Sequence, residues 1–146
     1  MFKHILLPTD GSAITASVLK KCLVLAKENG ATLTGVHVLV NSRVFAYQSG
    51  ELAAEARERH LRETEAHARQ FLAEIACAAE GAGVACDTLL VRHEQPYQAI
   101  LDAARERGCD LICMASHGRQ GVAGMLLASE TQKVLTHSPI PVLVMR

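Results

Sequence analysis

The sequence is poor in aromatic residues, with no Trp, two Tyr and three Phe. Proteins that bind single-stranded nucleic acid stack bases on aromatic side chains, so we do not expect such a platform here. Fifteen basic residues are balanced by fifteen acidic ones, which leaves no net charge to attract nucleic acid or a membrane surface. No apolar run approaches the roughly eighteen residues that span a bilayer. These absences argue against nucleic-acid-binding and membrane-spanning proteins.

The five cysteines include no Cys-x-x-Cys pair and are odd in number, which does not indicate a disulfide framework. Most lie in apolar segments, so we expect reduced, buried thiols. Cys109 and Cys113 are four residues apart, but no second pair completes a four-ligand zinc site. The start of the sequence carries Lys3, Pro8 and Asp10 before any long apolar segment, which makes a poor signal peptide. We therefore expect a cytoplasmic protein.

Several catalytic motifs are missing as well. The sequence has no Gly-x-x-x-x-Gly-Lys-Ser/Thr loop and no Gly-x-Gly-x-x-Gly pattern after its first strand, which argues against P-loop hydrolases and NAD enzymes. Its seven histidines lack the paired spacing of zinc hydrolases. No general base and metal-binding carboxylate are evident together, so we expect at most a slow ATPase and more plausibly no enzyme.

The 146 residues, 49% of them hydrophobic, fit one domain, residues 1–146, with a single well-filled core. Strands are predicted at residues 2–8, 31–40, 84–91, 111–115 and 142–145, with Pro8 closing the first. Helices are predicted at residues 13–29, 51–80 and 96–108, and from Ser129 to about residue 137. This alternation predicts an α/β fold with a parallel sheet and helices on both faces.

Pro8, Thr9 and Asp10 form the carboxyl end of the first predicted strand, and Ser12 is suited to cap the helix that follows. Ligands of such folds bind at the carboxyl ends of strands where the winding reverses. If the first and fourth strands are neighbours, Asp10 shares a crevice with the loop after the fourth strand. The alternative is a turn aspartate that bonds its own backbone.

The stretch 110–129 combines a buried strand, a loop and a predicted helix start near Ser129, where Gln132 completes a capping box. The loop contains three glycines, Gly118, Gly121 and Gly124. Glycine-rich turns and helix N-termini together bind anions well, although an ordinary strand-to-helix connection would look the same.

Two residues of this loop are candidate phosphate contacts. His117 either touches phosphate or satisfies the loop's own backbone, and Arg119 either binds phosphate or is exposed to solvent. The Ser129 hydroxyl is expected to cap the helix and can also face a phosphate. The segment 41–50 has no clear periodicity and is interpreted as a mobile lid or a partner contact.

Four short motifs follow one another along the chain: Ile-Leu-Leu-Pro-Thr-Asp-Gly-Ser near the start, His37-Val38, Ser116-His117-Gly118, and Ser-Pro-Ile-Pro-Val-Leu-Val-Met at the end. Together they resemble the universal stress protein family over essentially the whole chain. The resemblance implies an open five-stranded parallel sheet in the order 3-2-1-4-5, a Rossmann-like fold of the adenine nucleotide alpha hydrolase-like type. It also implies a homodimer that pairs through residues 142–145, an apolar edge otherwise exposed.

One branch of this family binds ATP through the motif Gly-x2-Gly-x9-Gly-Ser/Thr, in which x is any residue. Laid on this sequence, the pattern falls on Ala115, Gly118, Ala128 and Ser129. The adenine-side positions fall on Pro8, Asp10, Val38 and Met114. The next residue, whose backbone N–H would face phosphate, is Glu130.

The two alanines add methyl groups where the backbone approaches phosphate, and Glu130 brings a carboxylate to an anion site. We interpret the pattern as an adenine and ribose pocket with a weakened phosphate end. Two functions compete: a regulatory homodimer that binds ATP or AMP, and a stress protein dimer without nucleotide that acts through contacts with other proteins. The sequence leaves open whether Mg²⁺ accompanies the nucleotide.

Overall fold

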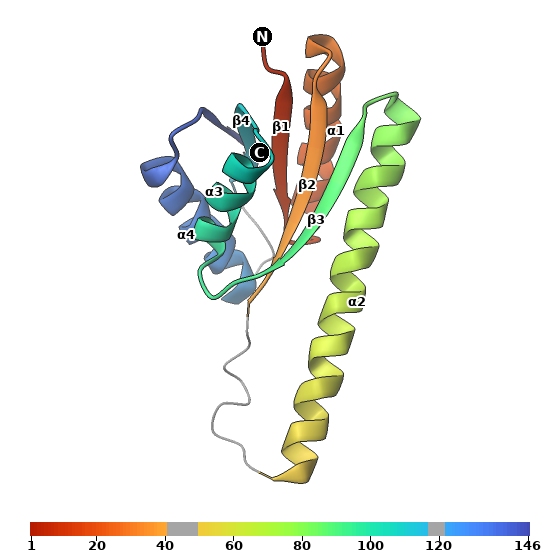
Figure 1. Cartoon of the computed structure of the whole chain (residues 1–146), viewed down its shortest axis with the longest axis vertical. Helices are drawn as coiled ribbons and strands as arrows, with labels where there is room; N and C mark the ends of the chain where they lie inside the picture. The colour runs from red at the N-terminus through yellow and green to blue at the C-terminus, as the bar shows by residue number, and fades with distance from the viewer. Residues whose placement is uncertain (41–49, 117–121) are drawn as a thin grey trace.

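The structure, a computed structural model, describes residues 1–40, 50–116 and 122–146. Strands and helices alternate along the chain (Figure 1). In order they are β1 (His4–Thr9), α1 (Ala13–Asn29), β2 (Thr32–Leu39), α2 (Glu51–Ala82), β3 (Cys86–Arg92), α3 (Pro96–Glu106), β4 (Leu111–Ala115), α4 (Val122–His137) and β5 (Val142–Met145).

The strands form one parallel sheet in the order β3-β2-β1-β4-β5, which confirms the predicted order. β1 lies between β2 and β4, so the winding reverses beside β1 and the carboxyl ends of β1 and β4 meet at one edge. Pro8 was predicted to close β1, but the strand continues to Thr9 and Pro8 pairs in register with Val36. A proline removes a single backbone donor and keeps its carbonyl, which this strand tolerates.

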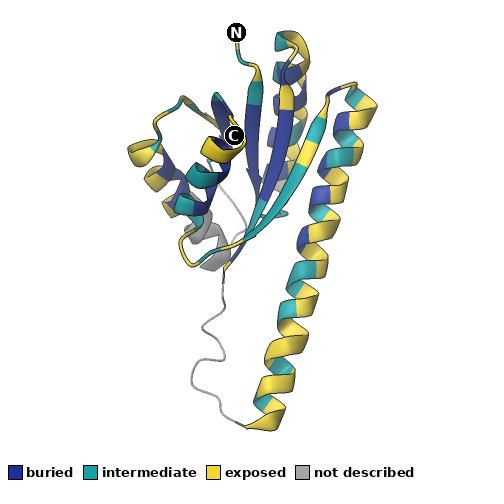
Figure 2. Ribbon diagram, in the orientation of Figure 1, coloured by how far each residue is buried: buried dark blue, intermediate teal, exposed yellow. Residues whose placement is uncertain are grey.

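Each face of the sheet has its own hydrophobic core. Ile5 and Leu7 of β1 pack with residues of α1 and α2, whereas Leu6 packs with residues of α3 and α4. Side chains alternate between the faces of a strand, so a strand covered on both faces needs an unbroken apolar run. Burial is accordingly concentrated in the strands and the inner faces of the helices (Figure 2).

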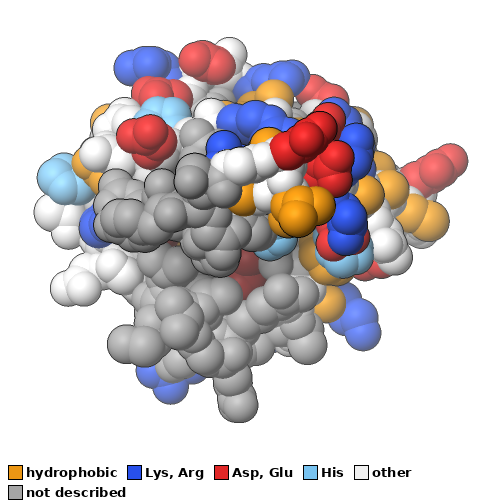
Figure 3. All heavy atoms as spheres, turned by 90° about the horizontal axis from the view of Figure 1, so that it is seen from below, with side chains coloured by type: hydrophobic (Ala, Val, Ile, Leu, Met, Phe, Trp, Pro, Cys, Tyr) orange, Lys and Arg blue, Asp and Glu red, His pale blue; other side chains and the backbone are white. Residues whose placement is uncertain are grey.

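A left-handed glycine follows each of the first two helices, and α2 extends two residues beyond its predicted end at residue 80. The Ser12 hydroxyl accepts the Thr15 N–H at 3.3 Å to start α1, and Gly30 ends it in the left-handed conformation with φ 63°. α2 runs past Gly81 to Ala82, and Gly83 ends it with φ 73°. Acidic and basic side chains are intermixed on the exposed face of α2 (Figure 3). Arg69 and Glu65 form one ion pair of this helix, at 2.9 Å. Within the described parts of the chain, every helix is too short or too polar to cross a bilayer.

The predicted start of the last helix is wrong. α4 begins at Val122, so Ser129 lies inside the helix, where its exposed side chain cannot act as the N-cap, and Gly124 belongs to the helix rather than to the loop. Residues 125–128 are strong helix formers, and their propensity extends the helix upstream despite the glycine. The capping-box pattern needs only Ser129 and Gln132, three residues apart, and here both residues lie within the helix, so the pattern did not mark its start.

Candidate functional site

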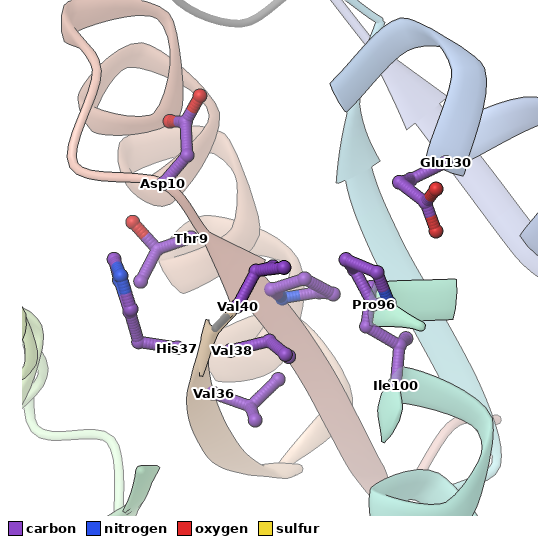
Figure 4. Close-up of a pocket in the computed structure, with 10 residues that line it drawn as sticks. Thr9, Asp10, Val36, His37, Val38, Val40, Pro96, Ile100 and Glu130 are labelled. Carbon is purple, nitrogen blue, oxygen red and sulfur yellow. The ribbon is translucent and has the colours of Figure 1, made fainter. Parts of the chain in front are cut away.

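A pocket of about 150 Å³ lies at the carboxyl ends of β1 and β2, on the side of the sheet that α3 and α4 cover. One wall consists of Val36, Val38 and Val40, which point to the same face because they are two residues apart. Pro96 and Ile100 of α3 form the opposite wall (Figure 4). The result is an apolar slot with polar groups at its ends, the usual form of a small-molecule site.

Asp10 lies at one end of this slot. Its Oδ1 accepts the Ser12 N–H at 2.9 Å and the Thr15 hydroxyl at 2.8 Å. The Thr9 hydroxyl accepts the Gly11 N–H at 3.1 Å, which tightens the same turn. Asp10 therefore forms the predicted turn contacts and also lines the pocket, so the two interpretations of this residue are compatible.

Glu130 of α4 lies at the other end and is only 5% exposed. Its Oε2 accepts the backbone N–H of Tyr97 at 2.6 Å, and its Oε1 accepts from Lys133 Nζ at 3.1 Å. Gln95, the N-cap residue of α3, makes no side-chain capping bond, so a carboxylate from another helix satisfies a donor of the first turn of α3. The sequence predicted Glu130 beside an anion, but this contact with α3 was not foreseen.

Met114 and Ala115 lie in β4, next to β1, and are 1% and 3% exposed. Met114 packs in the core under α3 and α4, and the Ala115 carbonyl accepts the Thr131 hydroxyl at 3.2 Å. The structure thus gathers Pro8, Thr9, Asp10, Val38 and Glu130 around the pocket. It places Met114 in the core on the same face of the sheet, and Ala115 in the core on the opposite face.

Other predicted site residues lie outside the described part of the chain. These are His117, Gly118, Arg119, the side chain of Ala128, and the segment 41–50 apart from Gly50.

The sequence did not single out Pro96, Ile100 or Val36 as pocket residues. Pro96 starts the helix that follows β3, and a proline at a first helical position after a strand is the signal that marks it. His37 points away from the valines of β2 and stacks on Phe71, with ring centroids 6.4 Å apart (Figure 4). It also borders a second hollow of about 400 Å³ beneath α2, where His60, Glu63 and His67 lie.

The described residues contain no cluster suited to a metal ion, and two buried cysteines have raised pKa values. Across residues 1–40, 50–116 and 122–146, no group of three or more His, Cys, Asp or Glu is placed to hold a metal ion. Cys22, Cys109 and Cys113 are buried and free, as predicted, whereas Cys77 is exposed. A hydrogen bond with Cys113, together with burial, raises the pKa of Cys22, and burial raises the pKa of Cys109 to about 11. Thiols that stay protonated are poor nucleophiles.

The family model described as the universal stress protein family matches residues 1–146. A universal stress protein of Thermus aquaticus is 33% identical over 146 residues, with 100% of both chains covered. The universal stress protein YxiE of Bacillus subtilis is 31% identical over 153 residues, again with 100% of both chains covered.

Solved structures share the same arrangement of strands and helices. Hypothetical protein MJ0577 is 27% identical with a TM-score of 0.78, and the match covers 99% of this chain and 96% of that one. A universal stress protein from Archaeoglobus fulgidus in complex with dAMP is 17% identical, with a TM-score of 0.71 and coverage of 99% and 98%. A universal stress protein in complex with cAMP is 21% identical, with a TM-score of 0.62 and coverage of 99% and 97%. At these identities the last two show a shared fold.

Proposed function

Since the chain belongs to the universal stress protein family, we propose that it binds an adenine nucleotide in the slot between β2 and α3 and acts as a stress-response regulator. The observation that carries this proposal is the shape of the slot. Val36 and Val38 face Pro96 and Ile100 across a narrow apolar gap, which suits a flat purine ring. Its volume, about 150 Å³, is small beside the roughly 300–1,000 Å³ of drug-sized sites, so it suits a base rather than a whole nucleotide.

The polar groups at the rim complete this arrangement. Asp10 lies where the sheet ends, and its carboxylate is positioned by Ser12 and Thr15 to accept ribose hydroxyls. Proteins of the same fold hold dAMP and cAMP, which supports an adenine ligand. The proposed contacts are Pro8, Thr9, Asp10, Val38, Met114, Ala115, His117, Gly118, Arg119, Ala128, Ser129 and Glu130.

The proposed regulator consists of one domain, works with little or no turnover, and forms a homodimer through β5 in the cytoplasm. In this scheme the ligand changes which surfaces the dimer presents to other proteins. The pocket offers Asp10 and Glu130 as acceptors, and both are already bound to protein donors, which suits binding rather than proton transfer.

Calorimetric titration with AMP tests the proposal. The wild-type protein is expected to bind with a dissociation constant on the order of micromolar. Val38→Phe places a ring in the slot and should weaken binding at least about tenfold. Val24→Phe is the matched control, because Val24 is 58% exposed on α1 and does not line the slot. Val38 is a sharper test than Asp10, whose loss would also disturb the start of α1.

Affinity that is unchanged in Val24→Phe but at least about tenfold weaker in Val38→Phe supports the proposal. Absence of heat from the wild type at millimolar AMP contradicts it and favours the alternative of a protein that acts only through protein contacts. Equal affinity in all three proteins would place the nucleotide elsewhere on the molecule.

A further inference from the structure

We infer that Glu130 makes the slot selective for adenosine and its least phosphorylated forms, so that each added phosphate weakens binding. This inference rests on the proposed adenine-binding function and names the ligand class that the slot takes. It starts from the charge of the slot. Of the residues that the structure describes around it, the carboxylates of Asp10 and Glu130 are the acidic ones, and no Lys or Arg lines it.

Glu130 is held in place by the protein. Its Oε2 accepts the Tyr97 N–H at 2.6 Å, and its Oε1 accepts from Lys133. Figure 4 shows the carboxylate directed from α4 toward the start of α3, across the slot from Asp10. The side chain is 5% exposed and is bonded to groups of two helices, which hold the carboxylate at the slot.

A carboxylate held in a fixed position favours ligands that offer it a hydrogen-bond donor and disfavours ligands that bring a negative charge. Each carboxylate oxygen has two lone pairs, so Glu130 retains acceptor capacity after its contacts with Tyr97 and Lys133. An amino group or a hydroxyl of adenosine can donate to it, whereas a phosphate has no proton to offer and carries the same charge. Repulsion between like charges is strong where water is largely excluded.

Lys133 only partly offsets this repulsion. Its Nζ lies 3.1 Å from Glu130 Oε1 and 5.6 Å from the centroid of the Tyr97 ring, and its side chain is 49% exposed. The ammonium group therefore contacts both Glu130 and the Tyr97 ring, and water partly screens its charge.

Titrations with adenosine, AMP, ADP and ATP, in buffer without divalent cations and at one ionic strength, test the inference. We expect the wild type to bind ATP about tenfold more weakly than adenosine, a difference of about 1.4 kcal/mol. Glu130→Gln keeps an acceptor for the Tyr97 N–H but removes the charge, so the ATP-to-adenosine ratio should fall to within about twofold.

Two further variants sharpen the comparison. Glu106→Gln removes one negative charge from the exposed end of α3, outside the slot, and should leave the ratio as in the wild type. Lys133→Met removes the cation beside Glu130 and should therefore raise the ratio of the ATP to the adenosine dissociation constant. This variant tests the inference even if Glu130→Gln folds poorly.

The outcomes separate this inference from the proposed function. ATP binding as tightly as adenosine, or a ratio unchanged by both Glu130→Gln and Lys133→Met, overturns the selectivity and leaves adenine binding intact. Failure of all four ligands to bind contradicts the adenine proposal, and the selectivity with it. A ratio that falls in Glu130→Gln and rises in Lys133→Met supports the inference.

Discussion

At the scale of single residues, Gly11 is the most constrained of the glycines that the structure describes. It turns the chain from β1 into α1 with φ 75°, and a Cβ placed there would lie 2.1 Å from Phe71 Cε2. Gly11→Ala should lower the free energy of unfolding by about 2–3 kcal/mol: about 1–2 from the left-handed backbone and the rest from displacing the Phe71 ring. Denaturant unfolding followed by circular dichroism measures the loss.

Gly30→Ala is the control for this prediction. Gly30 has φ 63°, but nothing lies within 4 Å of a Cβ built there. Its substitution should carry only the backbone cost, about 1–2 kcal/mol. Equal losses in the two variants would show that the Phe71 ring moves aside freely and that the contact is unimportant.

The two carboxylates of the site show what the sequence could and could not predict about single residues. Asp10 follows a buried strand and precedes a helix cap, so its place at the carboxyl edge was predictable from neighbours in sequence. The partner of Glu130 is a backbone N–H 33 residues away, on another helix. No local pattern encodes that contact, because it depends on how α3 and α4 pack.

At the scale of elements, Asp110 joins the starts of β4 and β1. Its carboxylate accepts the Lys3 N–H at 2.9 Å and the His4 N–H at 3.0 Å. Desolvation acts to raise the pKa of Asp110, but the backbone N–H groups of His4 and Lys3 outweigh it and hold the pKa below its usual value. Asp110→Ala should lower the free energy of unfolding at pH 7 by about 1 kcal/mol, reduced from the usual range by exposure to solvent.

The pH dependence of this loss has a definite sign. A depressed folded pKa stabilises the folded chain above the unfolded pKa of about 4, and the benefit disappears as the pH falls through the lower folded value. The wild type and Asp110→Ala should therefore converge in stability as the pH falls below the unfolded pKa of about 4 and through the lower folded pKa. Asp102→Ala is the control, since its contact with Arg105 is a surface pair within one helix. A difference between wild type and Asp110→Ala that persists in acid would contradict the argument.

Helices and strands were predicted well where the apolar pattern and the flanking polar, Gly or Pro residues indicated the same bounds. The bounds of β4 and β5 are those predicted, because each is a short apolar run between polar or proline-containing segments. The start of α4 was missed because Gly121, Gly124 and Ser129 all indicate loop or cap, whereas residues 125–128 favour helix. Where local sequence signals disagree, packing against the rest of the molecule decides whether a residue is helical. A short stretch of sequence does not contain that information.

At the scale of the whole molecule, β5 forms one edge of the sheet and pairs only with β4 among the described strands. Leu143 and Val144 are 39% and 36% exposed, so this edge presents apolar side chains together with backbone groups. Such an edge invites pairing with another strand, and in the proposed homodimer the β5 of a second copy covers it.

Val144→Lys tests that assembly. A lysine on an edge strand opposes association because pairing would bury its charge. Sedimentation equilibrium should give the wild type twice the mass of one 15.7 kDa chain, and Val144→Lys the mass of one chain. Leu52→Lys is the matched control, since Leu52 is 83% exposed at the start of α2, which packs beside β2 and β3 rather than β5. A wild type that remains monomeric at high concentration, or a Val144→Lys variant that still dimerises, would place the interface elsewhere, because the β5 edge cannot pair around a buried unpaired charge.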